Sequence, residues 1–258
     1  MVRNSYKLLA FGTVIGTLLV VLGASLFGSG QPVPTMSAVV KTSTPIYSVK
    51  TPEKVCSITF DCAWAADDIE RILQTLKKMN VKATFFVVGT WAQKNPEAIR
   101  LIEKDGHDIS SHGFTHLKFP QLERGRAKLE LENFLKEIKV IIKKDTWQGM
   151  NLFRAPYGDW NKNVVALAGE EGFHTIQWSV DTLDYKPNVT KDFIMGRVNT
   201  GVADGGIILM HTGTKLTAEI LEEIINKIWD KGFGIIPVSK LIYQQNYTVD
   251  ANGVQIKN

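Results

Sequence analysis

Short apolar runs alternate with amphipathic stretches along most of this chain. Seven runs have the length and the β-branched or aromatic content of buried strands, and the segments between them carry apolar residues at spacings of three and four. The runs are VCSITF (55–60), ATFFVV (83–88), HDIS (107–110), LFRA (152–155), HTIQWSV (174–180), GIILM (206–210) and FGIIPV (233–238). Such alternation predicts strand–helix cycles and therefore a parallel sheet with right-handed crossovers.

The clearest helical pattern covers residues 216–232, where the apolar residues form one stripe and Gly232 ends the pattern. The stripe consists of Leu216, Ile220, Leu221, Ile224, Ile225, Ile228 and Trp229. Asp67 and Asp68 are expected to begin the first helix, because negative charge is favourable in a first turn. Asn161 is expected to cap another helix.

Seven cycles within about 190 residues favour an α/β barrel over an open sheet. In both architectures the active site is expected at the carboxyl ends of the strands. The pattern divides the chain into a signal anchor or signal peptide (1–28), a linker rich in Gly, Ser, Thr and Pro (29–53), a folded domain (54–243) and a C-terminal tail (244–258).

The first segment has the pattern of an export signal. Arg3 and Lys7 precede an uncharged apolar run, Leu8–Phe27, which is long enough to span a bilayer as a transmembrane helix. A cleaved signal usually has a shorter apolar region and a clear small-x-small site, so the pattern favours an uncleaved anchor over a removed signal peptide. In both cases the rest of the chain is expected outside the cytoplasm, membrane-anchored or secreted.

Composition indicates a globular protein, with 44% hydrophobic and 22% charged residues and a net charge of +4. No basic run is interleaved with aromatic residues, so we expect no nucleic-acid partner. We expect a monomer.

Cys56 and Cys62 lie in one strand-like run, where six residues span about 20 Å, so an intrachain disulfide between them is not expected.

Polar residues that can carry chemistry follow five of the predicted strands. Asp61 follows the first, and SSHGFTHLKF places His112 and His116 at i and i+4, where one helical turn would direct both imidazoles to one metal ion. The later strands are followed by Arg154 and Tyr157, by Asp181 and Asp184, and by His211. Helix caps and solvated faces explain five such groups poorly, so we expect them to form one active site.

The motifs TFDCAW, SHGFTH, FRAPYG, WSVDTLDY and ILMHTG resemble, in order and approximate spacing, the five motifs of polysaccharide deacetylases with a NodB-type domain, carbohydrate esterase family 4. The resemblance covers roughly residues 54–243. It implies a distorted (β/α)7 barrel and a hydrolase that removes acetyl groups from chitin, peptidoglycan or xylan. The implied cofactor is one divalent metal ion, with zinc favoured and cobalt or manganese as alternatives.

The resemblance also implies a role for each matching residue. Asp61 corresponds to the general base and His211 to the general acid, while His112 and His116 correspond to metal ligands. Arg154 corresponds to the arginine that orients the base. A metal ion would polarise the amide carbonyl, a carboxylate would take a proton from the attacking water, and an imidazolium would protonate the leaving amine.

The remaining matches concern positioning and substrate contact. Asp184 corresponds to the acid that pairs with the catalytic histidine, with Asp181 as the rival residue. Tyr157 stands where the family uses a backbone amide against the developing oxyanion. Tyr185 and Leu209 correspond to apolar walls around the acetyl methyl group.

One position departs from the family pattern. The first motif usually carries two adjacent aspartates, the second being a third metal ligand, and here that position is Cys62. Either its thiolate ligates zinc as a soft donor, or Cys62 is an inert buried thiol. The frequent burial of cysteine favours the inert thiol. Asp67 or Asp68 reaching back is a third alternative. An Asp-Cys first motif resembles the sporulation-linked subgroup, which implies cell-wall or spore-cortex peptidoglycan of a spore-forming bacterium.

These observations favour a metal-dependent polysaccharide N-deacetylase, with the N-terminal segment in contact with the membrane. A carbohydrate-binding pseudoenzyme is the rival hypothesis, because Cys62 removes an expected ligand. An O-acetyl esterase with the same residues is a further alternative, since both linkages pass through similar tetrahedral intermediates. A purely structural barrel would predict that alanine at His112 or His211 changes only stability.

Overall fold

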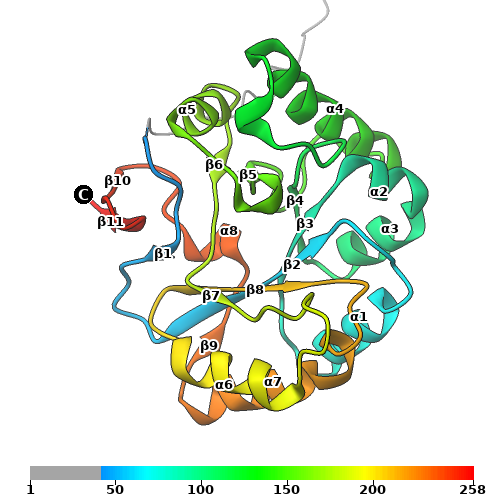
Figure 1. Cartoon of the computed structure of the whole chain (residues 1–258), viewed down its shortest axis with the longest axis vertical. Helices are drawn as coiled ribbons and strands as arrows, with labels where there is room; N and C mark the ends of the chain where they lie inside the picture. The colour runs from blue at the N-terminus through cyan, green and yellow to red at the C-terminus, as the bar shows by residue number, and fades with distance from the viewer. Residues whose placement is uncertain (1–41) are drawn as a thin grey trace, which may run out of the picture. The chain divides into compact units, whose positions relative to one another are not determined.

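Strands lie at the centre of the structure and helices surround them, as the alternating pattern predicts (Figure 1). The computed structural model describes residues 42–258. The strands are β1 (Ser48–Val49), β2 (Val55–Cys62), β3 (Thr84–Val87), β4 (Asp108–Ser111), β5 (Leu152–Phe153), β6 (His174–Thr175), β7 (Val180–Asp181), β8 (Gly206–His211), β9 (Gly234–Ile235), β10 (Tyr247–Val249) and β11 (Val254–Lys257).

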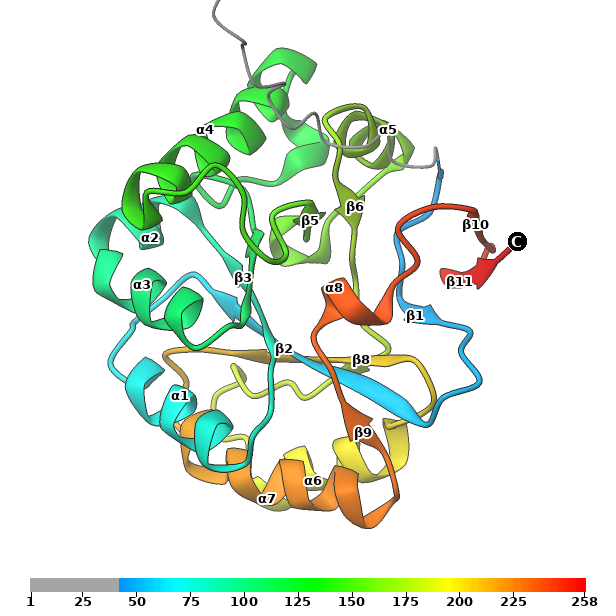
Figure 2. The same ribbon diagram turned by 180° about the vertical axis from the view of Figure 1, so that it is seen from behind.

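Helices α1 to α7 form the outer layer, and α8 lies on the far side of Figure 1 and toward the viewer in Figure 2. The helices are α1 (Ile69–Lys78), α2 (Gly89–Lys94), α3 (Pro96–Lys104), α4 (Arg124–Ile142), α5 (Lys162–Glu170), α6 (Lys191–Gly201), α7 (Thr217–Asp230) and α8 (Val238–Leu241), with 3-10 turns η1 (Phe119–Gln121) and η2 (Pro156–Gly158). This arrangement confirms the predicted α/β class.

Three of the seven predicted strands differ from the structure. The run 152–155 forms only the two residues of β5. The run 174–180 is divided into β6 and β7, because its middle residues leave the ladder. The run 233–238 forms only the short β9, which ends before Pro237. Proline has no N–H to donate to a ladder, and Pro237 instead stands at the N-cap of α8.

The sheet has the order β10-β11-β1-β8-β2-β3-β4-β5-β6, with β7 beside β8 and β9 beside β2. Strands β2 to β9 pair in parallel. Ile46, just before β1, forms a bridge with Ile176, just after β6, so the N-terminal segment connects the two ends of this parallel series. The curved sheet therefore gathers the carboxyl ends of its strands around one centre.

The sheet includes residues outside the range 54–243. Strand β1 belongs to the stretch expected as linker, and β10 and β11 belong to the stretch expected as tail. Gln255 of β11 is fully buried, and its side chain binds both the N–H and the carbonyl of Tyr243. The expected signal or anchor at 1–28 lies outside the described residues. Within 42–258, no helix has the length and apolarity needed to cross a membrane.

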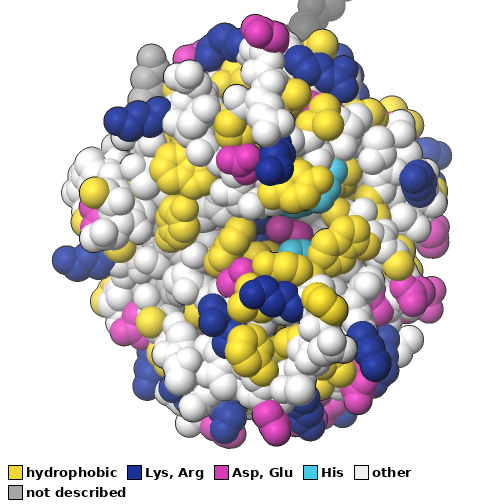
Figure 3. All heavy atoms as spheres, in the orientation of Figure 1, with side chains coloured by type: hydrophobic (Ala, Val, Ile, Leu, Met, Phe, Trp, Pro, Cys, Tyr) yellow, Lys and Arg dark blue, Asp and Glu magenta, His cyan; other side chains and the backbone are white. Residues whose placement is uncertain are grey.

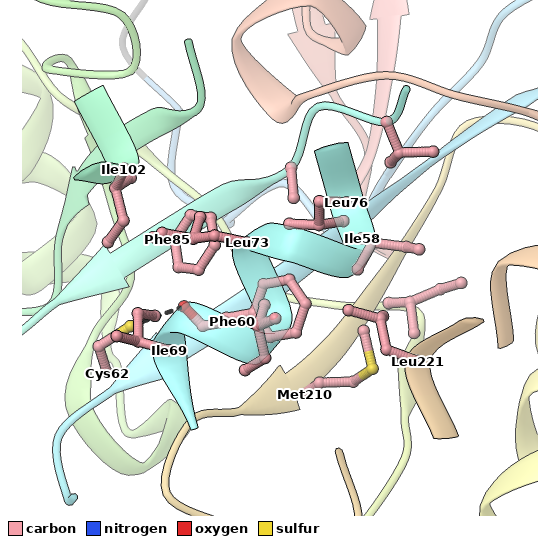
Figure 4. Close-up of a cluster of buried hydrophobic side chains, with 14 of the residues drawn as sticks. Ile58, Phe60, Cys62, Ile69, Leu73, Leu76, Phe85, Ile102, Met210 and Leu221 are labelled. Carbon is pink, nitrogen blue, oxygen red and sulfur yellow. Dashed lines mark hydrogen bonds between the residues drawn. The ribbon is translucent and has the colours of Figure 1, made fainter. Parts of the chain in front are cut away.

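Strand β2 has two different faces, because successive side chains of a strand point to opposite sides. Cys56, Ile58, Phe60 and Cys62 belong to the apolar core between the sheet and the helices (Figure 4). Asp61 lies on the other face, where its carboxylate contacts Arg154 from the end of β5. Both cysteines are free, as expected.

The predicted α7 stripe is buried along most of its length, but Trp229 is 40% exposed and does not belong to the core. Asn161 caps α5 through its side-chain oxygen, which accepts from Val164 N at 3.0 Å, as predicted. Asp68 stands at the N-cap of α1 but makes no capping bond with its side chain. Its carboxylate instead accepts the N–H of Gly213 at 2.9 Å.

Candidate active site

One pocket collects the polar groups that follow the strands. It is lined by Asp61, His112, His116, Asp181 and His211 together with Ala63, Trp64, Tyr157, Gly158, Trp178, Tyr185 and Leu209. Figure 3 shows histidine and acidic side chains at the bottom of a central hollow that hydrophobic side chains border. In the parallel pairing of β2 with β8, Asp61 and His211 are direct register partners. The carboxyl ends of two adjacent strands thus present a carboxylate, on the penultimate residue of β2, and an imidazole, on the last residue of β8, to one space.

A buried ion pair holds Asp61. Arg154 is fully buried, and its Nη1 donates to Asp61 Oδ1 at 2.7 Å and to Thr59 Oγ1 at 2.9 Å. The guanidinium also stacks on Phe86, 4.0 Å from the ring centroid. Burial alone would raise the pKa of the Asp61 carboxyl, but the charge of Arg154 and its hydrogen bond outweigh burial and hold that pKa below its usual value. Asp61 is therefore ionised at neutral pH.

The two expected metal ligands lie side by side. The ring centroids of His112 and His116 are 5.0 Å apart. His112 Nδ1–H donates to the carbonyl of Arg154 at 2.8 Å, and its Nε2 lies 3.5 Å from Asp61 Oδ2. Burial lowers the pKa of His112. Burial also lowers the pKa of His116, to about 4. Both imidazoles are therefore neutral at pH 7 and keep a lone pair for a metal ion, as ligation requires.

Cys62 does not supply a third donor to this pair. Its side chain is fully buried in the outer core near Ile69, and its Sγ lies 3.9 Å from the carbonyl of Phe60 (Figure 4). Burial raises the pKa of the Cys62 thiol well above its usual value. Among residues 42–258, no cluster of three or more His, Cys, Asp or Glu side chains has the arrangement of a metal site. Two imidazoles fit an ion such as zinc, and the Asp61 carboxylate lies 3.5 Å from His112 Nε2.

The Asp68 carboxylate, the third alternative for a metal ligand, makes no contact with the histidine pair. Its carboxylate binds Gly213 at the start of the loop that follows β8. A Cβ at Gly213, which has φ +71°, would lie 2.8 Å from the backbone of Ala65. Asp68 and this glycine therefore hold the loops after β2 and β8 against each other beside the pocket.

Asp184 is the carboxylate in contact with His211. Its Oδ1 accepts the Nδ1–H of His211 at 2.8 Å, and its Oδ2 accepts the N–H of His211 and the hydroxyl of Thr217. Burial would lower the pKa of His211, but the bond to Asp184 and its charge raise it above 6.5. Asp181 instead accepts the N–H of Leu183 at 2.8 Å. Thr217, at the first position of α7, gave no signal in the sequence.

An aromatic pair flanks His211. The ring of Trp64 stacks on the imidazole with 5.1 Å between centroids, and Tyr185 meets it edge-on at 5.0 Å. Tyr185 was expected in the pocket wall, whereas Trp64 was part of the first motif but received no role. The side chain of Leu209 is 2% exposed and lines the pocket near these rings.

Three residues around the pocket adopt backbone conformations that non-glycine residues rarely use. His116, Tyr157 and Leu183 have φ values of +61°, +63° and +57°. Each such conformation costs about 1–3 kcal/mol and tends to occur at functional sites. Tyr157 and Gly158 of η2 line the pocket, and the Tyr157 side chain is 63% exposed, with its ring centroid 4.6 Å from that of His116.

Comparison with known proteins gives a consistent result. The family model described as polysaccharide deacetylase matches residues 48–176. The uncharacterized protein YlxY of Bacillus subtilis is 33% identical over 202 residues, which cover 77% of this chain and 60% of YlxY. The peptidoglycan-N-acetylglucosamine deacetylase PgdA of Listeria monocytogenes is 35% identical over 201 residues, covering 75% of this chain and 41% of PgdA. The chain thus spans less than two thirds of the length of these relatives.

Among solved structures, BA3943 of Bacillus anthracis, a CE4 family pseudoenzyme, superposes with a TM-score of 0.73 at 28% identity, covering 84% of this chain and 74% of BA3943. A BA3943 mutant with restored enzymatic activity gives the same TM-score at 30% identity, covering 79% of this chain and 72% of the mutant. The fold of this chain therefore occurs both in a pseudoenzyme and in a mutant of that pseudoenzyme with restored enzymatic activity.

Proposed function

Because this chain belongs to the polysaccharide deacetylase family, we propose that it hydrolyses N-acetyl groups of a cell-wall or spore-cortex polysaccharide, peptidoglycan or a chitin-like glycan. The observation that carries this proposal is the placement of Asp61 and His211 at the ends of adjacent strands, each bound to a partner of opposite charge. We propose that the protein acts outside the cytoplasm as a monomer, with the expected signal or anchor at 1–28 in contact with the membrane.

Asp61 acts as the base in this proposal. Its carboxylate is ionised and held in one orientation by Arg154, so it can accept a proton from a water that attacks the amide carbon. Its second oxygen faces the histidine pair and the pocket rather than the guanidinium. Arg154 therefore fixes the base without blocking it.

His211 acts as the acid. Its Nδ1 is bound to Asp184, so Nε2 is left to give a proton to the leaving amine. The bond to Asp184 raises the pKa of His211 and so favours the imidazolium over the neutral imidazole. The backbone amide at Tyr157 is the proposed donor to the developing oxyanion, and Tyr185 with Leu209 form the proposed wall around the acetyl methyl group.

His112 and His116 are the proposed ligands of one divalent metal ion, with zinc favoured over cobalt or manganese because two imidazoles suit it. When bound, such an ion supplies Lewis-acid polarisation of the substrate carbonyl. The hydrogen bond from His112 Nδ1 to Arg154 fixes the tautomer that leaves Nε2 available.

A carbohydrate-binding pseudoenzyme is the second candidate. Two observations favour it: Cys62 lies on the opposite face of β2 from the pocket, and the fold matches that of a CE4 family pseudoenzyme. Against it, Asp61, Arg154, Asp184 and His211 keep the bonding that acid and base chemistry needs, which a binding protein does not require.

Acetate release from N-acetylated glycan oligomers and from peptidoglycan, with added zinc or with chelator, tests the proposal. We expect release that chelator abolishes. An arm with O-acetylated glycans separates an amidase from an O-acetyl esterase. Glycan binding without release on any substrate or metal, by folded protein, would support the pseudoenzyme instead.

A further inference from the structure

The catalytic pocket is adjacent to a second hollow beyond His211. The two share the side chains of Trp64 and Tyr185, which are 47% and 44% exposed. Their ring centroids lie 6.3 Å apart, and both rings contact the imidazole of His211. A sugar that presented its acetyl group to His211 would lie beside this aromatic pair, with the second hollow next to it.

The second hollow carries positive charge. Apart from Trp64, its lining comes from two loop segments, 184–189 after β7 and 213–216 after β8. Lys186 and Lys215 belong to these segments, and both are exposed. Lysine and arginine side chains border the central hollow in Figure 3.

These two lysines have no carboxylate partner within residues 42–258, where no ion pair includes either of them. Asp184 is the acidic residue of the lining, but it is buried and both of its oxygens already accept hydrogen bonds from His211 and Thr217. Two ammonium groups are thus available to an anionic ligand in a hollow next to the catalytic pocket.

We infer that the second hollow binds a sugar that bears a carboxylate, next to the sugar whose acetyl group is removed. This inference rests on the proposed function and narrows its substrate to acidic glycans. The exposed faces of Trp64 and Tyr185 offer apolar surface to a sugar ring, and Lys186 with Lys215 pair with its carboxylate. The carboxylate belongs either to a lactyl ether, as in muramic acid, or to a uronic acid, whereas chitin has none.

The expected size of the effect follows from exposure. Ion pairs between exposed groups contribute little each and are screened by salt, so the two lysines together should change affinity by about three- to tenfold at low ionic strength. The preference should fall as salt is added, while the contribution of the aromatic pair should not.

Equilibrium binding of the full chain to three tetrasaccharides tests this inference, with chelator present to suppress turnover. The ligands are an N-acetylglucosamine–N-acetylmuramic acid tetrasaccharide without peptide, the same glycan with its carboxyls converted to methylamides, and chitotetraose. A fourth ligand, an N-acetylated glycan with uronic acid at alternate sugars, distinguishes the two carboxylate sources. The variants are Lys186→Gln with Lys215→Gln, and Lys240→Gln in α8 as a control, because Lys240 is an exposed lysine far from the pocket.

We expect about three- to tenfold tighter binding of a carboxylate glycan than of the methylamide or chitotetraose, a preference that the double variant loses and Lys240→Gln keeps. Equal affinity for all ligands, or a preference that survives the double variant, would overturn the inference. Acetate release is measured separately. Binding preference without release contradicts the proposed function alone, and release without preference contradicts this inference alone.

Discussion

Asp61 and Cys62 are neighbours in β2, yet their side chains lie in opposite environments. The carboxylate faces Arg154 and the pocket, while the thiol is buried among apolar side chains under the helices. Because of this alternation, a substitution at position 62 can leave the proposed base, Asp61, in place. At this position, burial and strand geometry favour an inert thiol over a soft metal donor.

Cys62→Ala should therefore leave zinc affinity unchanged within about twofold, and should lower the free energy of unfolding by about 1 kcal/mol because it leaves a small cavity. Competition with a fluorescent zinc chelator and denaturant unfolding measure these quantities. His112→Ala is the matched control and should lose zinc affinity. A comparable loss in Cys62→Ala would instead identify the thiolate as a ligand.

The pH dependence of the reaction should report His211. The bond to Asp184 raises the pKa of His211, and the proposed mechanism needs the imidazolium, so the rate should fall as pH rises through that raised pKa. Asp184→Asn removes the charge that opposes burial, so the alkaline limb should move down by about one pH unit or more, with the maximal rate lowered about a hundredfold.

Asp181→Asn provides the control for that profile, because Asp181 lies near His211 but binds Leu183 N instead. Its alkaline limb should stay close to that of the wild-type protein. A larger displacement in Asp181→Asn than in Asp184→Asn, measured as rate against pH, would reverse the assignment of the two acids.

The stretch 46–49, which includes β1, connects the two ends of the series of parallel strands. Ile46 is 2% exposed and bridges Ile176, while Val49 of β1 is 1% exposed. Ile46→Ala should lower the free energy of unfolding by about 2–4 kcal/mol, the usual cost of removing a buried isoleucine side chain. Val140→Ala on the outer side of α4, where Val140 is 71% exposed, should change it by less than about 0.5 kcal/mol.

Urea unfolding of the two variants, followed by circular dichroism, makes this comparison. If Ile46→Ala were as stable as Val140→Ala, the segment would not be part of the cooperative fold. The sequence pointed to a linker here because the buried residues of the segment are few and lie between Pro, Ser and Thr, so no periodic pattern marks β1.

Across the whole molecule, the elements that the sequence predicted are those that a local pattern of apolar residues marks. The apolar runs of β2, β3 and β8 and the stripe of α7 are long enough to identify buried elements. The division of 174–180 into β6 and β7 and the pairing of β1 with β11 depend on contacts between distant segments, which no local pattern contains. The same holds for Thr217, whose hydroxyl binds Asp184 from another element.

The site residues were predicted because each follows an apolar strand within a recognisable motif. What sequence alone left open was orientation: which acid meets His211, and which way Cys62 points. The structure brings Asp184 to His211 and places Cys62 in the core, and both follow from strand register and from the turn at Leu183.

Asp61, held by Arg154, is the proposed base of an acetyl-hydrolysing site. The rate of acetate release from an N-acetylated glycan by the wild-type chain and by Asp61→Asn tests it most directly, with thermal unfolding to establish that both are folded. We predict release by the wild-type chain and a loss of about a hundredfold or more in Asp61→Asn. Equal rates of acetate release by the two folded proteins would exclude Asp61 as the base.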